Sequence, residues 1–137
     1  MTKSWRSLIP RFVKVFVKQF ILGKYRRETK LVEYQGFRLN LNYSSDIERF
    51  ILNSKDFEPH LVELSKDFIK EGDIVFDVGA NVGIHTTLFS RLVGNTGKVI
   101  AFEPNKINLE RLYLNLKLNQ IENVEVIEKA LGESVKE

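Results

Sequence analysis

Residues 73–83, with the sequence DIVFDVGANVG, combine a carboxylate with two glycines four positions apart. The apolar residues at 74–76 are typical of a buried parallel strand. Gly79 and Gly83 favour a strand-to-helix turn in which the backbone comes close to a ligand. Glu103 follows a second apolar run twenty residues after Gly83. Nucleotide-binding α/β folds place an acidic residue at about that distance on the ribose hydroxyls, so the pattern predicts a nucleoside cofactor.

The choice of cofactor depends on charge and on a missing glycine. A dinucleotide fingerprint has a glycine in the middle of its loop to admit a pyrophosphate, and this chain has Asn81 there. Asp77 would repel a phosphate but attract a cationic ligand. S-adenosylmethionine has no phosphate and carries a sulfonium and an amine. We therefore expect Asp77 at the cationic end of that cofactor, the glycines at its methionine portion and Glu103 at its ribose, and we disfavour a nicotinamide-dependent oxidoreductase.

A longer stretch around this loop resembles the FkbM-type family of S-adenosylmethionine-dependent methyltransferases. The resemblance covers residues 31–137 and includes the DVGAN-x-G loop, a threonine three residues after the second glycine and the AFEPN segment. It implies methyl transfer to a small-molecule or glycan acceptor, usually a hydroxyl oxygen of a sugar, lipid-linked glycan or polyketide-like molecule. The cofactor-binding residues that it implies are Asp77, Gly79, Asn81, Gly83, Thr86, Glu103, Pro104 and Asn105.

No residue is assigned as the catalytic base. His85 opens the helix after the cofactor loop, where it is also suited to packing within the first turn. Glu58 matches an acidic position of the family, but a carboxylate at a helix N-terminus is also stabilised by the helix dipole. His60 lies on the same helix as Glu58, and no ligand spacing surrounds either histidine, so we expect no metal site.

The residues before the loop predict a small entry region. Two alternating segments, LVEYQ and FRLNLN, flank Gly36 and indicate a hairpin. A helix follows from Asp46, with Ser45 and Glu48 spaced as a capping box. A further helix is predicted over residues 59–71, with a buried face formed by Leu61, Leu64 and Phe68.

Strands and helices alternate from residue 72 onward. After the strand at 74–76, the pattern predicts a helix over 84–93, a strand over 98–103, a helix over 106–119 capped by Asn105, and a strand over 123–128. This order is typical of a doubly wound parallel sheet, so we expect the α/β, Rossmann-like fold of class I methyltransferases. Three domains are predicted: a basic helix over 1–30, the entry region over 31–71 and the cofactor-binding half over 72–137.

Only three strands of that fold are present, so we expect a version truncated after the third strand. Residues 74–76 would then form an unpaired apolar edge. We expect that these 137 residues alone do not transfer methyl groups. A non-catalytic fragment that retains a cofactor half-site remains the alternative function.

Charge is concentrated at the N-terminus. Residues 1–30 contain nine Lys and Arg against a single Glu, and a helix there would have basic residues on one face and three phenylalanines on another. Three interpretations stay open: a helix packed on the catalytic domain, an interfacial membrane helix and a nucleic-acid arm. Phenylalanine-rich faces favour core or membrane over phosphate contact, so we expect possible peripheral membrane contact and no nucleic acid. The absence of cysteine agrees with a cytoplasmic location.

Overall fold

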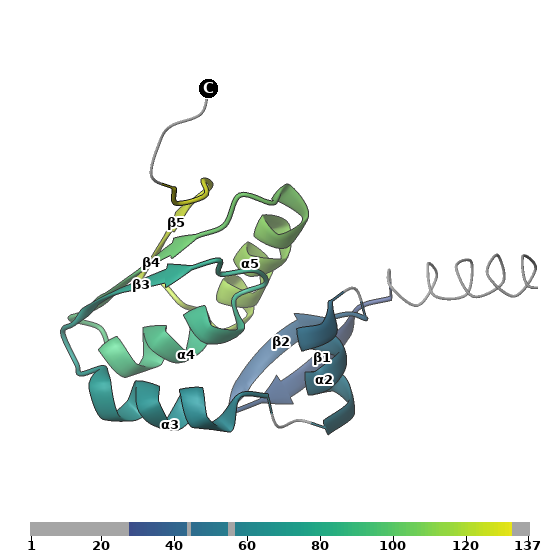
Figure 1. Ribbon diagram of the computed structural model, residues 1–137, viewed down its shortest axis with the longest axis horizontal. Coiled ribbons are helices and arrows are strands. Elements are labelled where there is room, and N and C mark those ends of the chain that lie inside the picture. The colour runs from purple at the N-terminus through teal and green to yellow at the C-terminus, as the bar shows by residue number, and fades with distance from the viewer. Residues whose placement is uncertain (1–27, 44, 55–56, 133–137) are drawn as a thin grey trace, which may run out of the picture.

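The computed structural model describes residues 28–43, 45–54 and 57–132 of the chain (Figure 1). The basic helix predicted at the N-terminus falls almost wholly on residues 1–27, outside this description. The described elements are β1 (Lys30–Tyr34), β2 (Phe37–Leu41), α2 (Asp46–Ser54), α3 (Pro59–Phe68), β3 (Ile74–Val78), α4 (Ile84–Val93), β4 (Lys98–Phe102), α5 (Lys106–Leu118) and β5 (Val124–Ile127). Apart from the end of α3, these bounds lie within two residues of the predicted ones.

The three later strands form a parallel sheet in the order β3-β4-β5. Asp77 on β3 is aligned with Ala101 on β4, so both strands end at the same edge of the sheet. One face of this sheet is covered by α4 and α5 (Figure 1). Leu109, Leu112 and Leu116 of α5 pack there against Ala101. The predicted α/β, Rossmann-like fold is confirmed.

The hairpin β1–β2 forms a second, antiparallel sheet. Its two-residue turn has positive φ at both positions, 51° at Gln35 and 76° at Gly36, which matches the turn type that fits strand twist best. Leu39 and Leu41 are fully buried in a core shared with Val82 of the loop between β3 and α4. The predicted hairpin is therefore confirmed, and its buried leucines pack against the loop between β3 and α4.

A buried ion pair joins the entry region to α5. The serine cap is confirmed, because the Glu48 backbone N–H donates to Ser45 Oγ at 3.2 Å, and the Ser45 hydroxyl also donates to Glu48 Oε1 at 3.1 Å. The Glu48 side chain is 1% exposed and pairs with Arg111, which is 11% exposed. Arg111 Nη1 donates to Glu48 Oε1 at 2.8 Å, and Arg111 Nη2 donates to the carbonyl of Asn40 at 3.1 Å.

The buried face predicted for α3 is wrong. The helix ends at Phe68 and buries Val62 and Ser65 instead, because this side lies against α4. Ser65 is accommodated there because its hydroxyl donates to the carbonyl of Leu61 at 2.6 Å. The predicted core residues are exposed, at 37% for Leu61, 51% for Leu64 and 77% for Phe68. Helical spacing identified an apolar stripe correctly, but it does not specify which side of a helix meets the rest of the chain.

Candidate functional site

The loop between β3 and α4 crosses the carboxyl end of β4. The backbone N–H groups of Gly79 and Ala80 both donate to the carbonyl of Phe102, at 2.9 and 3.0 Å. Three loop residues have positive φ: 83° at Gly79, 54° at Asn81 and 86° at Gly83. Glycine and asparagine are the residues that adopt this conformation at least cost.

The two glycines serve different purposes. A Cβ atom at Gly83 would lie 2.5 Å from Leu112 Cδ1, so this glycine lets α5 approach the loop. A Cβ atom at Gly79 would meet no atom within 4 Å, because Gly79 is exposed and faces open space. The loop therefore leaves room for a ligand over Gly79 and packs tightly at Gly83.

Glu103 directly follows β4 and fixes the loop with its carboxylate. Its side chain accepts the backbone N–H of Asn81 at 2.9 Å through Oε2. Its Oε1 accepts the backbone N–H of Asn105 at 2.8 Å and the side-chain amide of Asn108 at 3.3 Å. The residue is 5% exposed. Sequence reasoning found Glu103 but missed Asn108, for which only its place in the first turn of α5 gives a signal.

The two residues after Glu103 lie at the surface beside it. Asn105 has the predicted capping role, because its Oδ1 accepts the backbone N–H of Ile107 at 2.9 Å. Its side chain is therefore committed to α5. Pro104 is exposed at the end of β4.

Asp77 is almost buried beneath the loop, at 9% exposed. The Thr86 hydroxyl donates to Asp77 Oδ2 at 2.6 Å, so the structure brings these two predicted residues together. Burial raises the pKa of Asp77 above its ordinary value of 3.8, because the charged form loses hydration. The Thr86 hydrogen bond and the nearby His85 oppose this rise in the pKa, and Glu103 adds to it.

The raised pKa makes Asp77 a source of instability when it ionises. Between pH 3.8 and the raised folded-state value, the folded protein binds more protons than the unfolded one, so stability falls as the pH rises through this window. We expect Asp77→Asn to remove this fall and to leave the ligand-free protein more stable than wild type at pH 7. Urea unfolding from pH 3 to pH 7 measures the effect, with exposed Asp67→Asn on α3 as the control. A variant less stable than wild type at pH 7 would contradict the role of burial.

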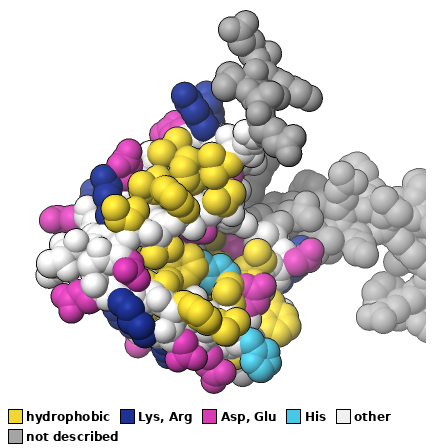
Figure 2. Space-filling view, turned by 60° about the vertical axis from the view of Figure 1, so that its left-hand side comes forward, with side chains coloured by type: hydrophobic (Ala, Val, Ile, Leu, Met, Phe, Trp, Pro, Cys, Tyr) yellow, Lys and Arg dark blue, Asp and Glu magenta, His cyan; other side chains and the backbone are white. Residues whose placement is uncertain are grey.

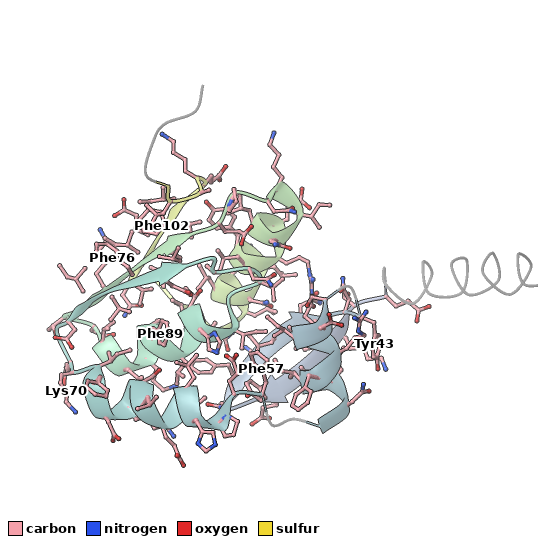
Figure 3. All side chains as sticks on the ribbon, viewed as in Figure 1. Tyr43, Phe57, Lys70, Phe76, Phe89 and Phe102 are labelled. Carbon is pink, nitrogen blue, oxygen red and sulfur yellow. The ribbon has the colours of Figure 1, made fainter. Side chains whose placement is uncertain are left out.

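An imidazole–carboxylate pair lies beside the loop. His85 Nε2 is 3.3 Å from Glu58 Oε2, with the two side chains 24% and 47% exposed. The imidazole of His85 lies near the rings of Phe57 and Phe89, with ring centroids 5.8 and 6.0 Å away. Figure 3 labels both phenylalanines. Tyr34 fixes this segment, because its hydroxyl donates to the carbonyl of Phe57 at 2.8 Å.

The pair offers a candidate general base, in which the carboxylate of Glu58 can orient the imidazole of His85. An imidazole held by a carboxylate can accept a proton from a hydroxyl group. Glu58 adopts a left-handed conformation with φ of 46° at the start of α3, which is uncommon for a residue with a side chain. His60 lies exposed on α3 and has no place in this pair.

A broad groove of about 1130 Å³ lies at the opposite edge of the sheet, between the Gly94–Gly97 turn and the loop before β5. In this groove Asn123 has a structural role, because its side-chain amide donates to the carbonyls of Ser90 and Gly94 at 2.9 and 2.8 Å and so links α4 to the loop before β5.

Among the described residues, no three His, Asp or Glu side chains are grouped to hold a metal ion. No helix in the described ranges is long and apolar enough to cross a membrane.

Comparison with known sequences identifies a family. Residues 18–132 match the family model of protein-L-isoaspartate(D-aspartate) O-methyltransferase (PCMT). Protein-L-isoaspartate O-methyltransferase 2 of Archaeoglobus fulgidus is 38% identical over 71 residues, covering 50% of this chain and 32% of that protein. Hexuronic acid methyltransferase AglP of Haloferax volcanii is 28% identical over 89 residues, covering 65% of this chain and 36% of its own length. The chain thus spans about a third of these curated relatives.

Solved structures agree on the fold. A candidate rRNA methylase from Clostridium thermocellum superposes with a TM-score of 0.50 at 30% identity, over 52% of this chain and 40% of that one. A candidate transferase from Pyrococcus horikoshii gives a TM-score of 0.57 at 17% identity, over 85% of this chain and 46% of that one. The second likeness concerns the fold alone.

The expectation that nucleic acid has no place among the partners is wrong. A tRNA (cytosine(72)-C(5))-methyltransferase of Pyrococcus horikoshii is 32% identical over 59 residues, covering 43% of this chain and 15% of that protein. This enzyme and the candidate rRNA methylase show that proteins similar to this chain include ones named as methyltransferases of RNA. The expectation rested on phenylalanines at the N-terminus, which carry no information about the substrate of the cofactor-binding half.

The matching family is PCMT, a methyltransferase family with S-adenosylmethionine as the methyl donor, and the FkbM-type family expected from the sequence is not confirmed. The predicted cofactor is therefore confirmed for the family. Because the match extends from residue 18 to residue 132, this chain belongs to the protein-L-isoaspartate(D-aspartate) O-methyltransferase (PCMT) family.

Proposed function

We propose that residues 72–137 form the cofactor-binding half of an S-adenosylmethionine-dependent O-methyltransferase, with residues 31–71 as the entry region that packs against it. One observation supports this most: Glu103 holds Asn81 at the carboxyl ends of two adjacent parallel strands, beside open space over Gly79. Ligands of open α/β folds bind at this edge of the sheet.

The residues present suit the cofactor. Oε1 of Glu103 already accepts two donors and Oε2 accepts one, so Oε2 retains a lone pair for a ribose hydroxyl. Asp77, oriented by Thr86, attracts the cationic end of the cofactor. The space over Gly79 admits its methionine portion. Asn81 and Gly83 shape the loop, and Pro104 and Asn105 complete the surface beside Glu103. When bound, S-adenosylmethionine supplies an already activated methyl group.

Isothermal titration with S-adenosylhomocysteine and with NAD tests the cofactor assignment. We expect tighter binding of S-adenosylhomocysteine. Glu103→Ala should weaken it at least about tenfold, because it removes a ribose hydrogen bond to a charged acceptor, which contributes about 1.5–3 kcal/mol, and also the hydrogen bond that holds the backbone of Asn81. Glu125→Ala, an exposed substitution on β5, serves as the control and should leave the affinity unchanged. Tighter binding of NAD than of S-adenosylhomocysteine would contradict the assignment.

The first candidate acceptor is a carboxylate oxygen. Two relatives are named for isoaspartate and for hexuronic acid, and both of these compounds carry a carboxyl group. A carboxylate is ionised at neutral pH, so it attacks the methyl group without a base. Methyl transfer to it depends mainly on placement, which a rigid loop and sheet edge supply.

The second candidate acceptor is a sugar hydroxyl, as the FkbM-type resemblance implies. The His85–Glu58 pair favours this reaction, because a hydroxyl must lose its proton as it attacks. Both reactions use the same cofactor site and differ in their need for that pair.

Transfer of a labelled methyl group distinguishes the two acceptors. Because these 137 residues alone are expected not to transfer methyl groups, the assay uses a protein in which this chain is extended to the length of its curated relatives. An isoaspartyl peptide and glucuronic acid offer carboxylates, whereas methyl glucoside offers only hydroxyls. A methyl ester releases volatile methanol in alkali, and a methyl ether does not. We expect alkali-labile label, unaffected by His85→Asn; alkali-stable label that is lost in His85→Asn would establish the hydroxyl reaction instead.

A further inference from the structure

The outer edge of β2 pairs with side chains from the C-terminal end of α5. β2 hydrogen-bonds β1 in a two-stranded sheet, and α5 lies beside it (Figure 1). The Asn119 side chain accepts the backbone N–H of Arg38 at 2.9 Å and donates to the carbonyl of Arg38 at 2.8 Å. Two residues along the strand, the backbone N–H of Asn40 donates to Asn115 Oδ1 at 2.7 Å. Amide side chains from this end of α5 thus take the place of a third strand.

The Asn115 amide also contacts the loop between β3 and α4. Its Nδ2 donates to the carbonyl of Val82 at 2.8 Å, while its Oδ1 accepts the N–H of Asn40. Val82 follows Asn81, the loop residue whose backbone N–H donates to Glu103. Both contacts need a donor and an acceptor on one side chain, which an amide provides. One planar group therefore links the entry region to the loop.

Burial makes this link costly to lose. Charged side chains of both signs are spread over the surface in the space-filling view, where water can reach them (Figure 2). Asn115 and Val82 are instead both 0% exposed. Loss of the Asn115 amide would leave the Val82 carbonyl without this donor at a place that water does not reach. Such a loss costs more than the loss of a hydrogen bond at the surface.

We propose, on the basis of the cofactor site proposed above, that Asn115 is a positioning residue for the cofactor. It holds the loop in the conformation that presents Gly79 and Asn81 to S-adenosylmethionine, and it couples this conformation to the packing of β2 against α5. Because Asn115 is fully buried, it acts through Val82 and not by contact with the cofactor. Binding that stabilises the loop also stabilises the contact with Asn40, since coupling between two sites is reciprocal.

Amide hydrogen exchange of the ligand-free chain tests the hold on the loop. Asn115→Ala removes the contacts with β2 and with Val82, whereas the matched control Asn119→Ala removes contacts with β2. With the amides of β4 as the reference for global unfolding, we expect the amides of Asn81 and Gly83 to exchange at least about tenfold faster in Asn115→Ala, because a buried hydrogen bond is lost. Asn119→Ala should keep both amides within about twofold of wild type. No acceleration, or equal acceleration in the two variants, would overturn the proposal.

Isothermal titration with S-adenosylhomocysteine measures the effect on the cofactor site. Asn115→Ala should weaken binding at least about tenfold, and Asn119→Ala should leave the affinity within about twofold of wild type. Unchanged affinity in Asn115→Ala would contradict its positioning role. A wild-type chain that binds no S-adenosylhomocysteine would refute the cofactor site instead, and exchange in the ligand-free loop would still decide whether Asn115 holds it.

Hydrogen exchange of the wild-type chain provides a test that does not depend on the folding of either variant. Saturating S-adenosylhomocysteine should slow exchange of the Asn40 amide at least about fivefold more than that of the Arg38 amide. The reason is that Asn40 contacts Asn115, which reaches the loop, whereas Arg38 contacts Asn119. Equal slowing of the two amides would show that the ligand stabilises the chain as a whole, and it would overturn the coupling.

Discussion

Arg111→Ala is expected to lower the free energy of unfolding by about 3–5 kcal/mol. The substitution removes the cation that pairs with Glu48 and leaves a carboxylate whose side chain is 1% exposed. The backbone N–H of Asn42 at 2.7 Å and the Ser45 hydroxyl would still contact that carboxylate. Neutral donors such as these do not replace a bidentate guanidinium for a buried charge.

Urea unfolding at pH 7 measures the loss, and two further variants define its cause. Arg49→Ala removes an exposed ion pair to Asp46, with side chains 39% and 93% exposed, and should cost no more than about 1 kcal/mol. A double variant, Glu48→Leu with Arg111→Met, removes both charges and should regain much of the lost stability. Equal losses for Arg111→Ala and Arg49→Ala would refute the importance of burial.

Gly79→Val should reduce the affinity for S-adenosylhomocysteine at least about 100-fold, or about 2.7 kcal/mol. The valine side chain would project into the open space over the loop, where the methionine portion of the cofactor is proposed to lie. A positive φ of 83° also strains any residue with a Cβ atom, so some loss of stability accompanies the loss of binding.

Gly72→Val separates these two effects. Gly72 has a φ of 90°, and a Cβ atom there would meet only the Thr96 hydroxyl, at 3.7 Å, so its backbone strain is comparable. It lies before β3, at the other end of the strand from the cofactor loop. Thermal unfolding should show similar destabilisation for both variants, and calorimetric titration should show weakened binding for Gly79→Val alone. Unchanged affinity in Gly79→Val would place the cofactor elsewhere.

The elements of this protein could be predicted from sequence because their signals are local. The turn at Gly36, the serine cap at Ser45 and the cap at Asn105 each involve residues within three positions of one another. Glu103 could also be placed near the loop, since parallel strands joined by a short helix end at the same edge of a sheet.

The packing of those elements was decided by tertiary structure. The sequence marked an apolar stripe on α3, but the fold turned Val62 and Ser65 toward α4 and left Leu64 and Phe68 exposed. A helix buries whichever side meets its neighbour, and periodicity carries no information about that neighbour.

The partners of the charged residues likewise depended on the fold. Glu48 and Arg111 are 63 positions apart. Glu58 directly precedes α3 and His85 lies in α4, so no spacing rule connects either pair. Glu103 was expected to bind a ligand, and the structure adds that it also holds the backbone of Asn81. Residue types and local spacings determined which helices, strands and reactive side chains this chain possesses. Contacts between distant segments determined which of those side chains meet, because such contacts form only when the whole chain folds.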